Sequence, residues 1–195
     1  MTAPARVPQA PGVAAWVAGE PVTVAEVEAR LAVLRSSFFG TRLPAADTAE
    51  GRNARRWVTQ LLCAERIVRN ALAVHGITPR ERPRQLRLNQ ALAVGGVTAA
   101  VLATIPELGL WASRWPLPIE EATIRDYYQR NPDLYADRDI SYADARDQVA
   151  SELHRAAVDR AIAAWLDQRL ASDTVLADGF EHPASPANPD TAHRH

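Results

Sequence analysis

The sequence contains no lysine, and only one cysteine and one methionine among its 195 residues. Because all 22 cationic Lys/Arg side chains are arginine, chemistry that needs a lysine is excluded, including Schiff-base formation and the phosphate-binding lysine of nucleotide loops. The single cysteine, Cys63, cannot form an internal disulfide, so nothing suggests an oxidising compartment. The formal net charge of −1 argues against a general nucleic-acid-binding surface.

Long apolar runs are also missing. No run approaches the roughly 18 residues that a membrane-spanning helix needs, and the first twelve residues, MTAPARVPQAPG, lack the apolar core of a secretory signal. We therefore expect a cytoplasmic protein whose partners include neither nucleic acid nor membrane. No G-x-S-x-G motif occurs, which removes the usual nucleophile of acyl transfer.

A long stretch near the C-terminus, residues 141–171, has neither glycine nor proline. Ser141 followed by Asp144 forms a near capping box, in which the serine oxygen accepts a free backbone N–H of the first turn. Apolar residues then recur at helical spacing, and their stripe drifts around the helix. The pattern predicts one long helix that faces two different neighbours.

A second long helix is predicted over residues 47–75, starting near Asp47 or Thr48, with Glu50 placed for a capping box and Gly76 as its stop. Thr23 and Glu26 form a capping box at the start of an earlier helix. Its apolar stripe follows at helical spacing. The residues that we expect it and the second long helix to bury are Val24, Val27, Leu31, Leu34, Trp57, Leu61, Ala64, Val68 and Leu72.

The remaining segments complete a mainly α-helical fold of about six helices with a minor β element. Shorter helices are predicted at Arg84–Val94, Thr98–Ile105 and Ile119–Arg130, whereas Glu107–Pro118 and 131–140 read as irregular. The strand and turn at Val13–Val22 are expected to pair with Thr174–Leu176. We expect a disordered lead-in over 1–12, a single domain over 13–177 and a flexible Pro/His-rich tail over 178–195.

Three segments resemble a known family. VAAWVAGEPVTVAEVEARL, residues 13–31, resembles the opening of the SurA and PrsA group of bacterial peptide-binding chaperones, where a short strand and turn lead into the first helix. TIRDYYQRNPDLY, residues 123–135, resembles the segment that leads into the parvulin prolyl-isomerase domain of that group. The helix Tyr142–Ala171 resembles the one to which the chain returns after that domain.

The resemblance implies the chaperone scaffold without the isomerase. A parvulin domain needs roughly ninety residues in that family, and here only ADRDIS separates Tyr135 from Tyr142. The parvulin His, Cys and Asp cluster has no counterpart. We therefore expect a non-catalytic SurA-like chaperone or peptide-binding module, with a protein or peptide client as its partner.

The layout, with its His-containing tail, also resembles small bacterial proteins encoded beside aromatic polyketide enzymes, some of which carry an acyltransferase label. The missing nucleophile motif does not support that label. The resemblance implies an alternative, an accessory protein that binds an acidic carrier protein or an aromatic small molecule.

Aromatic side chains gather between residues 111 and 142, and they can line a groove for a peptide or a flat ligand, because aromatic rings offer large contact areas at a low entropy cost. Core packing and loop anchoring are the alternative roles. The candidates are Trp111, Trp115, Tyr127, Tyr128, Tyr135 and Tyr142. Trp16, Trp57 and Trp165 are expected in the core.

Two arginine groups are candidates for docking an acidic partner or a phosphate, with a solvated helix face as the alternative. One consists of Arg80, Arg82, Arg84 and Arg87, and the other of Arg52, Arg55 and Arg56.

The tail offers His182, His193 and His195 as candidate zinc ligands. Without a cysteine or a fixed His-x₃-His spacing, a solvated tail is the alternative, so no cofactor is expected beyond zinc at this tail. His75 and His154 lack a nucleophile or carboxylate at a triad spacing, and Cys63 is expected to be a packed thiol.

Overall fold

A small antiparallel sheet lies at the N-terminal end of the chain, with strand order β2-β1-β3. The computed structural model describes residues 10–36, 43–80, 92, 94–135, 139–182, 185 and 190. In this part of the chain the fold is mainly helical, with six α-helices and the one sheet, as the sequence predicts. The chain forms two compact units, Met1–Glu81 with Leu166–His195, and Arg82–Trp165.

The sheet joins the two ends of the chain. Strands β1 (Val13–Val17) and β2 (Glu20–Thr23) form a hairpin whose turn residues, Ala18 and Gly19, have φ values of 50° and 86°. Positive φ at both central positions is typical of the type I′ turn, which matches the twist of paired strands. Strand β3 (Thr174–Leu176) pairs with the other edge of β1 in antiparallel register. The predicted pairing of the N-terminal strand with Thr174–Leu176 is therefore confirmed.

Helix α1 (Val24–Ser36) starts at the predicted capping box. The backbone N–H of Glu26 donates to Oγ1 of Thr23 at 3.1 Å, and the Glu26 carboxylate accepts from the backbone N–H of Thr23 at 2.6 Å. The hydrogen bond from the Thr23 backbone also lowers the pKa of Glu26. The helix buries Val27 and Leu31, whereas Val24 and Leu34, which were also expected to be buried, are partly exposed.

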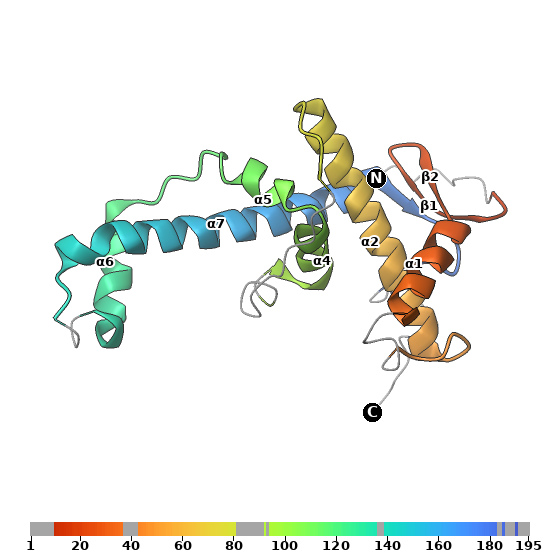
Figure 1. Ribbon diagram of the computed structural model, residues 1–195, viewed down its shortest axis with the longest axis horizontal. Helices are drawn as coiled ribbons and strands as arrows, with labels where there is room; N and C mark the ends of the chain where they lie inside the picture. The colour runs from red at the N-terminus through yellow and green to blue at the C-terminus, as the bar shows by residue number, and fades with distance from the viewer. Residues whose placement is uncertain are drawn as a thin grey trace, which may run out of the picture. The chain divides into compact units, whose positions relative to one another are not determined.

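Helix α2 (Ala49–Val74) packs against α1 and β1, as Figure 1 shows. Its N-cap is Thr48, whose Oγ1 accepts from the N–H of Gly51 at 3.0 Å. The expected capping box with Glu50 is therefore wrong by one residue, because the residue three positions after the cap is Gly51.

The other end of α2 is closed by a Schellman motif, in which Gly76, at φ 67°, donates to the Ala73 carbonyl and Ile77 donates to the Leu72 carbonyl, both at 2.9 Å. The predicted glycine stop is confirmed. Of the stripe predicted for this helix, Leu61, Ala64, Val68 and Leu72 are buried and Trp57 is partly exposed.

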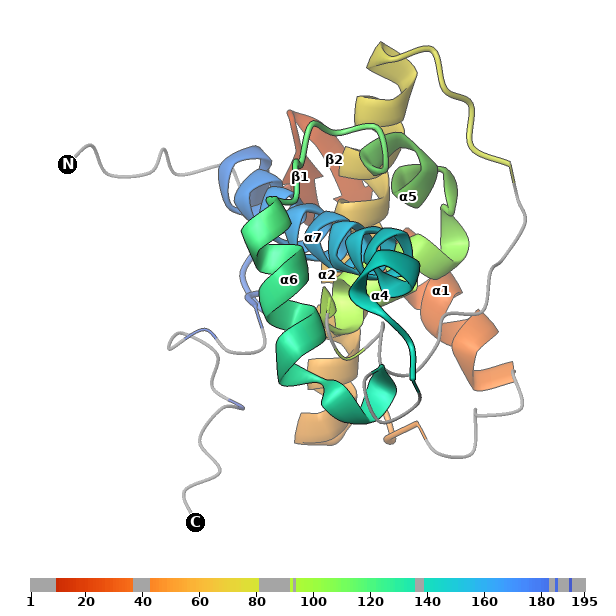
Figure 2. The ribbon, with the colours of Figure 1, turned by 90° about the vertical axis from the view of Figure 1, so that its left-hand side faces the viewer.

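The second unit contains helices α4 (Gly96–Thr104), α5 (Glu107–Ala112) and α6 (Glu121–Arg130), the short 3₁₀ helix η2 (Pro132–Leu134) and most of α7 (Tyr142–Asp173). Figure 2 shows α6 against the first part of α7. Ile124, Tyr135, Ala145 and Val149 form the buried core of that contact. The backbone N–H of Asp144 donates to Oγ of Ser141 at 3.2 Å, which confirms the predicted start of the long helix.

Two segments expected to be irregular are partly helical. Helix α5 occupies the first half of Glu107–Pro118, because Pro106 stands at its N-cap and the Pro106 carbonyl accepts from Gly109 and Leu110. Proline is well suited to a helix start, where its missing N–H is not needed. Similarly, η2 lies within 131–140 and begins at Pro132. The predicted helix Arg84–Val94 lies outside the described residues except for Leu92 and Val94, which are helical.

Candidate functional site

The aromatic residues predicted to line one groove form two separate clusters. The tryptophan cluster consists of Trp111, Trp115 and Trp165, with ring centroids 5.1, 5.6 and 6.1 Å apart and edge-to-face geometry. Trp165, which the sequence assigns to the core, is partly exposed, as are the other two indoles. The cluster therefore presents aromatic surface to solvent.

Helix α5 positions two of these indoles. Trp111 lies in its last turn, and Trp115 follows one turn later, where its backbone N–H donates to the Ala112 carbonyl at 2.9 Å. Side chains four residues apart lie on one side of a helical turn, so both indoles reach Trp165 on α7. Leu110, also on α5, is 64% exposed. This apolar surface suits contacts with an apolar or aromatic segment of a partner.

The tyrosine cluster consists of Tyr128, Tyr135 and Tyr142. The Tyr128 ring stacks on Tyr135 at 5.3 Å and meets the edge of Tyr142 at 5.4 Å. Its hydroxyl donates to the Ile140 carbonyl at 2.8 Å, and Tyr135 is 4% exposed. Tyr127 packs against the same core. These rings contact one another, so the tyrosine cluster anchors the loop between α6 and α7.

Charged groups reinforce the tyrosine cluster. The hydroxyl of Tyr142 donates to the Glu121 carboxylate at 2.6 Å, and Arg146 forms an ion pair with that carboxylate at 2.7 Å. The hydrogen bond from Arg146 is the largest cause of the lowered pKa of Glu121, and the hydrogen bond from Tyr142 is the next. The bond between Tyr142 and Glu121 also raises the pKa of Tyr142. The Arg125 guanidinium lies 4.4 Å from the centre of the Tyr142 ring. Burial raises the pKa of Tyr135.

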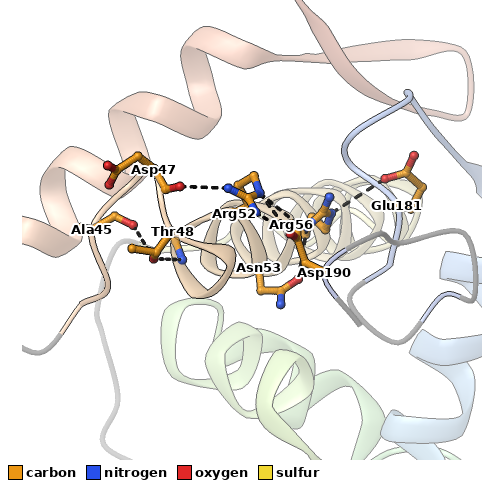
Figure 3. A network of polar contacts seen from close by, with 9 residues as sticks. Ala45, Asp47, Thr48, Arg52, Asn53, Arg56, Glu181 and Asp190 are labelled. Atoms are coloured by element: carbon orange, nitrogen blue, oxygen red, sulfur yellow. Dashed lines mark hydrogen bonds and ion pairs between the residues drawn. The ribbon is translucent and has the colours of Figure 1, made fainter. Parts of the chain in front are cut away.

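The second arginine group forms a network that the sequence does not reveal, and Figure 3 shows it. Arg56 donates to the Asp190 carboxylate at 2.6 Å, and Arg52 donates to the same carboxylate at 2.5 and 3.0 Å. The side chain of Arg56 is 3% exposed and that of Asp190 is 7% exposed. We call Arg52 and Arg56 the arginine cradle of Asp190.

Further contacts hold the C-terminal segment near the cradle. Glu181 lies 3.8 Å from Nε of Arg56, and the Arg55 guanidinium lies 4.8 Å from the centre of the Phe180 ring. Phe180 is 8% exposed. The sequence leaves open whether the chain beyond Asp178 folds back onto the domain. These contacts show that its described residues do so.

The hydrogen bonds from Arg52 and then Arg56 lower the pKa of Asp190 far below that of a free aspartate, and the bond to Asp190 raises the pKa of Arg52. Arg55 itself forms an ion pair with Glu28 of α1 at 2.7 Å. The three arginines predicted to dock an acidic partner therefore contact acidic or aromatic groups of their own chain.

An open pocket of about 650 Å³ lies beside β2, α1 and α2, in the first unit. Arg30 and Glu65 form a bidentate pair across its wall at 2.8 and 2.9 Å, and Arg66 donates to the Glu26 carboxylate at 2.8 Å and to the Pro21 carbonyl. These paired charges connect α1, α2 and the hairpin. No local signal in the sequence indicates the Arg30–Glu65 pair, because its partners are 35 residues apart.

The other predicted site residues fall into two groups. Arg80 and His182 are exposed, whereas Arg82, Arg84, Arg87, His193 and His195 lie outside the described residues. Within the part of the chain that the structure describes, no three His, Cys, Asp or Glu side chains are placed to hold a metal ion. His154 lies 3.2 Å, by Nδ1, from the Leu117 carbonyl. Cys63 is fully buried, and burial raises the pKa of its thiol to about 12, in agreement with a packed thiol.

Comparison with known proteins gives one partial match. A family described as "Family of unknown function (DUF7158)" matches residues 13–50, which contain the hairpin, α1 and the start of α2. No curated protein and no solved structure matches the chain. None of the helices in the described ranges has the length and apolar character that crossing a membrane requires.

Proposed function

We propose that this protein is a non-catalytic, chaperone-like module that binds unfolded or extended polypeptide segments in the cytoplasm, and that the tryptophan cluster is part of its contact surface. The observation that carries the proposal is the set of three partly exposed indoles in mutual contact, together with Leu110, which precedes Trp111 in α5 and is 64% exposed. Rigid aromatic side chains give large contact areas at a low entropy cost, and they recur at the centres of protein interfaces.

The connection between α6 and α7 supports the non-catalytic part of the proposal. Tyr135 and Tyr142, which flank the connection, both contact Tyr128, and the Tyr128 hydroxyl bonds to Ile140 within it. The ends of this connection are thus held on one ring, and ADRDIS between them is far too short for an isomerase domain. The strand, turn and helix over 13–31, the segment 123–135 and the long return helix are the segments that carry the resemblance to SurA and PrsA.

Binding to a permanently unfolded client protein tests the proposal. We expect Leu110→Asp to weaken binding, measured by fluorescence anisotropy of the labelled client, by about tenfold, because a charge replaces an apolar contact worth about 1.4 kcal/mol. Val33→Asp on α1 is the matched control, because Val33 is also 64% exposed and lies in the first unit. Equal loss in both variants, or no binding by the wild-type protein, contradicts the proposal.

A prolyl-isomerase assay on a short proline peptide tests the other half. We expect no acceleration over the uncatalysed rate, and measurable turnover that scales with protein concentration would overturn the non-catalytic assignment. Cell fractionation with an antibody against the protein checks the cytoplasmic location.

The tryptophan cluster equally suits a flat aromatic ligand, which is the basis of the alternative proposal, an accessory protein of aromatic polyketide biosynthesis. In this case a polycyclic aromatic intermediate quenches the fluorescence of Trp111, Trp115 and Trp165, and Leu110→Asp weakens the quenching. An acidic carrier protein is the other partner of this alternative. Because Arg52, Arg55 and Arg56 contact groups of their own chain, carrier binding requires that those contacts change.

A further inference from the structure

The open pocket of the first unit is bounded by β2, α1 and α2, which Figure 1 shows. Along its α2 wall, Leu62, Glu65, Arg66 and Arg69 recur at helical spacing, so these side chains lie along one side of the helix. The volume of about 650 Å³ falls within the range of small-molecule sites, about 300–1,000 Å³. The pocket therefore has room for a ligand of modest size.

Four of the charged groups at this pocket are paired with one another and hold its walls in place. Arg30 of α1 binds both oxygens of the Glu65 carboxylate on α2, at 2.8 and 2.9 Å. Arg66 of α2 donates to the Glu26 carboxylate of α1 at 2.8 Å and to the carbonyl of Pro21 on β2. Because these bonds join the three elements, the walls are formed before a ligand arrives, which lowers the entropy cost of binding.

Two further charged groups at the pocket have opposite signs and different positions. Glu20 lies on β2 at the hairpin turn, and Arg69 lies on α2. Both side chains are exposed, and neither forms a hydrogen bond or an ion pair within the part of the chain that the structure describes. Asn70, also exposed, adds an amide beside Arg69, and Leu62 and Pro21 add apolar surface. The pocket therefore offers one available group of each sign and an apolar contact.

The complementary ligand carries a cation for Glu20, an anion for Arg69 and an apolar group for Leu62. A guanidinium suits a carboxylate, to which it can donate two parallel hydrogen bonds. A free amino acid has both charges on one carbon, whereas Glu20 and Arg69 stand on separate elements and are not paired with each other. The ends of a dipeptide backbone lie up to about 7 Å apart, so a short peptide bridges separated groups better.

We propose that this pocket binds a short peptide with free termini and apolar side chains, whose carboxylate is held by Arg69 and Asn70 and whose ammonium group is held by Glu20. The inference goes beyond the proposed function and does not rest on it, because the pocket belongs to the first unit and the tryptophan cluster to the second. Client binding that Leu110→Asp weakens therefore stands or falls separately.

Isothermal titration calorimetry of the full-length wild-type protein with synthetic probes tests the proposal. The dipeptide Leu-Leu carries every recognised group, whereas acetyl-Leu-Leu lacks the ammonium group, Leu-Leu amide lacks the carboxylate and Gly-Gly lacks the apolar side chains. We expect Leu-Leu to bind and each of the other three to bind about tenfold more weakly, because each loses a charge-assisted hydrogen bond or an apolar contact.

This comparison uses one protein, so it does not depend on the folding of a variant. Absence of Leu-Leu binding, or equal affinity for Leu-Leu and the two charge-blocked peptides, overturns the proposal. Free leucine should bind more weakly than Leu-Leu. If leucine binds as tightly, the assignment of a peptide to this pocket is wrong.

Two variants then assign each terminus to its partner. Arg69→Gln should weaken Leu-Leu binding about tenfold and leave the affinity for Leu-Leu amide unchanged, because the amide carries no charge for the guanidinium. Glu20→Gln should weaken Leu-Leu binding and leave that of acetyl-Leu-Leu unchanged. Arg114→Gln is the matched control for Arg69→Gln, because Arg114 is also exposed and lies in the second unit, and it should change no affinity. If Arg69→Gln weakens Leu-Leu and Leu-Leu amide equally, Arg69 does not bind the carboxylate and the proposal fails.

Discussion

Gly51 provides the sharpest test of how α2 begins. A Cβ at this position would lie 1.9 Å from the carbonyl oxygen of Ala45, 2.8 Å from its carbonyl carbon and 2.9 Å from Cα of Ala46. All three are backbone atoms, so no side-chain rotation relieves the clash. The turn that precedes α2 has to move by more than 1 Å to restore an ordinary contact of about 3.2 Å.

That turn is tied to the helix by the same atoms. The hydroxyl of Thr48 donates to the Ala45 carbonyl at 2.8 Å and accepts from the N–H of Gly51 at 3.0 Å, as Figure 3 shows. Displacing Ala45 breaks the bond that its carbonyl accepts from the Thr48 hydroxyl, which contributes about 1 kcal/mol. Alanine regains about 1 kcal/mol over glycine within a helix, and overpacking costs about 1–3 kcal/mol. The net expectation for Gly51→Ala is a loss of roughly 2 kcal/mol.

Gly109→Ala is the matched control. Its Cβ would meet only Cδ2 of Leu102, at 3.7 Å, so the substitution should stabilise the protein by about 0.5–1 kcal/mol through helix propensity. In urea unfolding followed by far-UV circular dichroism, the two variants should differ in opposite directions from the wild type. In thermal unfolding, Gly51→Ala should lower the midpoint by roughly 4–8 °C for a chain of this size. If both variants are equally stable, or if Gly51→Ala is stabilising, the described approach of Ala45 to α2 is wrong.

Two further predictions concern buried groups. Arg30→Ala should destabilise the protein by about 2 kcal/mol, because it removes the arginine that binds both oxygens of the Glu65 carboxylate, whose side chain is 7% exposed. The expected loss is smaller than that for a wholly buried pair, since the Arg30 side chain is 29% exposed. The double variant Arg30→Met/Glu65→Met should lose clearly less in urea unfolding, and an additive or larger loss contradicts this reasoning. Burial raises the pKa of Cys63 from 9.0 to about 12, so the unfolded chain loses this proton before the folded protein does. The stabilising contribution of the protonated thiol is present below about pH 9 and falls by at most roughly 1.4 kcal/mol per pH unit above it. The free energy of unfolding of Cys63→Ala should therefore improve relative to that of the wild type between pH 9 and 12. Parallel curves of unfolding free energy against pH for the two proteins would show that the thiol ionises freely.

The parts of the fold that the sequence predicts are those that depend on neighbouring residues. Thr23 with Glu26 and Ser141 with Asp144 form their predicted caps, because a cap satisfies backbone donors only three residues away. Gly76 ends α2 for a similarly local reason, its left-handed φ of 67°. The pairing of β3 with β1 was also predicted, since each strand shows an apolar run beside a break in the helical pattern.

Where prediction failed, two local signals competed. Pro106 ends α4 and also begins α5, and only the first of these roles is predicted. At the start of α2, Asp47 and Thr48 are both good caps, and Glu50 stands three residues after the first of them only. The structure uses Thr48 because its hydroxyl also reaches the Ala45 carbonyl, a contact that depends on the path of the preceding turn.

The sequence indicates which residues belong to the candidate site, but it does not indicate how they are arranged in space. Trp111, Trp115 and the tyrosines were all singled out, but composition alone does not separate rings that anchor a loop from rings that meet solvent. Trp165 joins Trp111 and Trp115 because α7 passes beside α5, a contact between segments about 50 residues apart in the sequence. Exposure, which decides the role of an aromatic residue, follows from such contacts.

The arginine cradle shows why local charge overstates the availability of a basic group. Arg52, Arg55 and Arg56 form a cationic run in the sequence, yet Asp190, 134 residues beyond Arg56, pairs with two of them. An acidic partner at this surface therefore gains the contacts only if Asp190 loses them, because Arg56 has no second exposed face to offer. Binding of such a partner and release of the C-terminal segment are then linked reciprocally. Any contact that stabilises the docked segment must lower the partner's binding affinity by the same factor by which the partner disfavours docking.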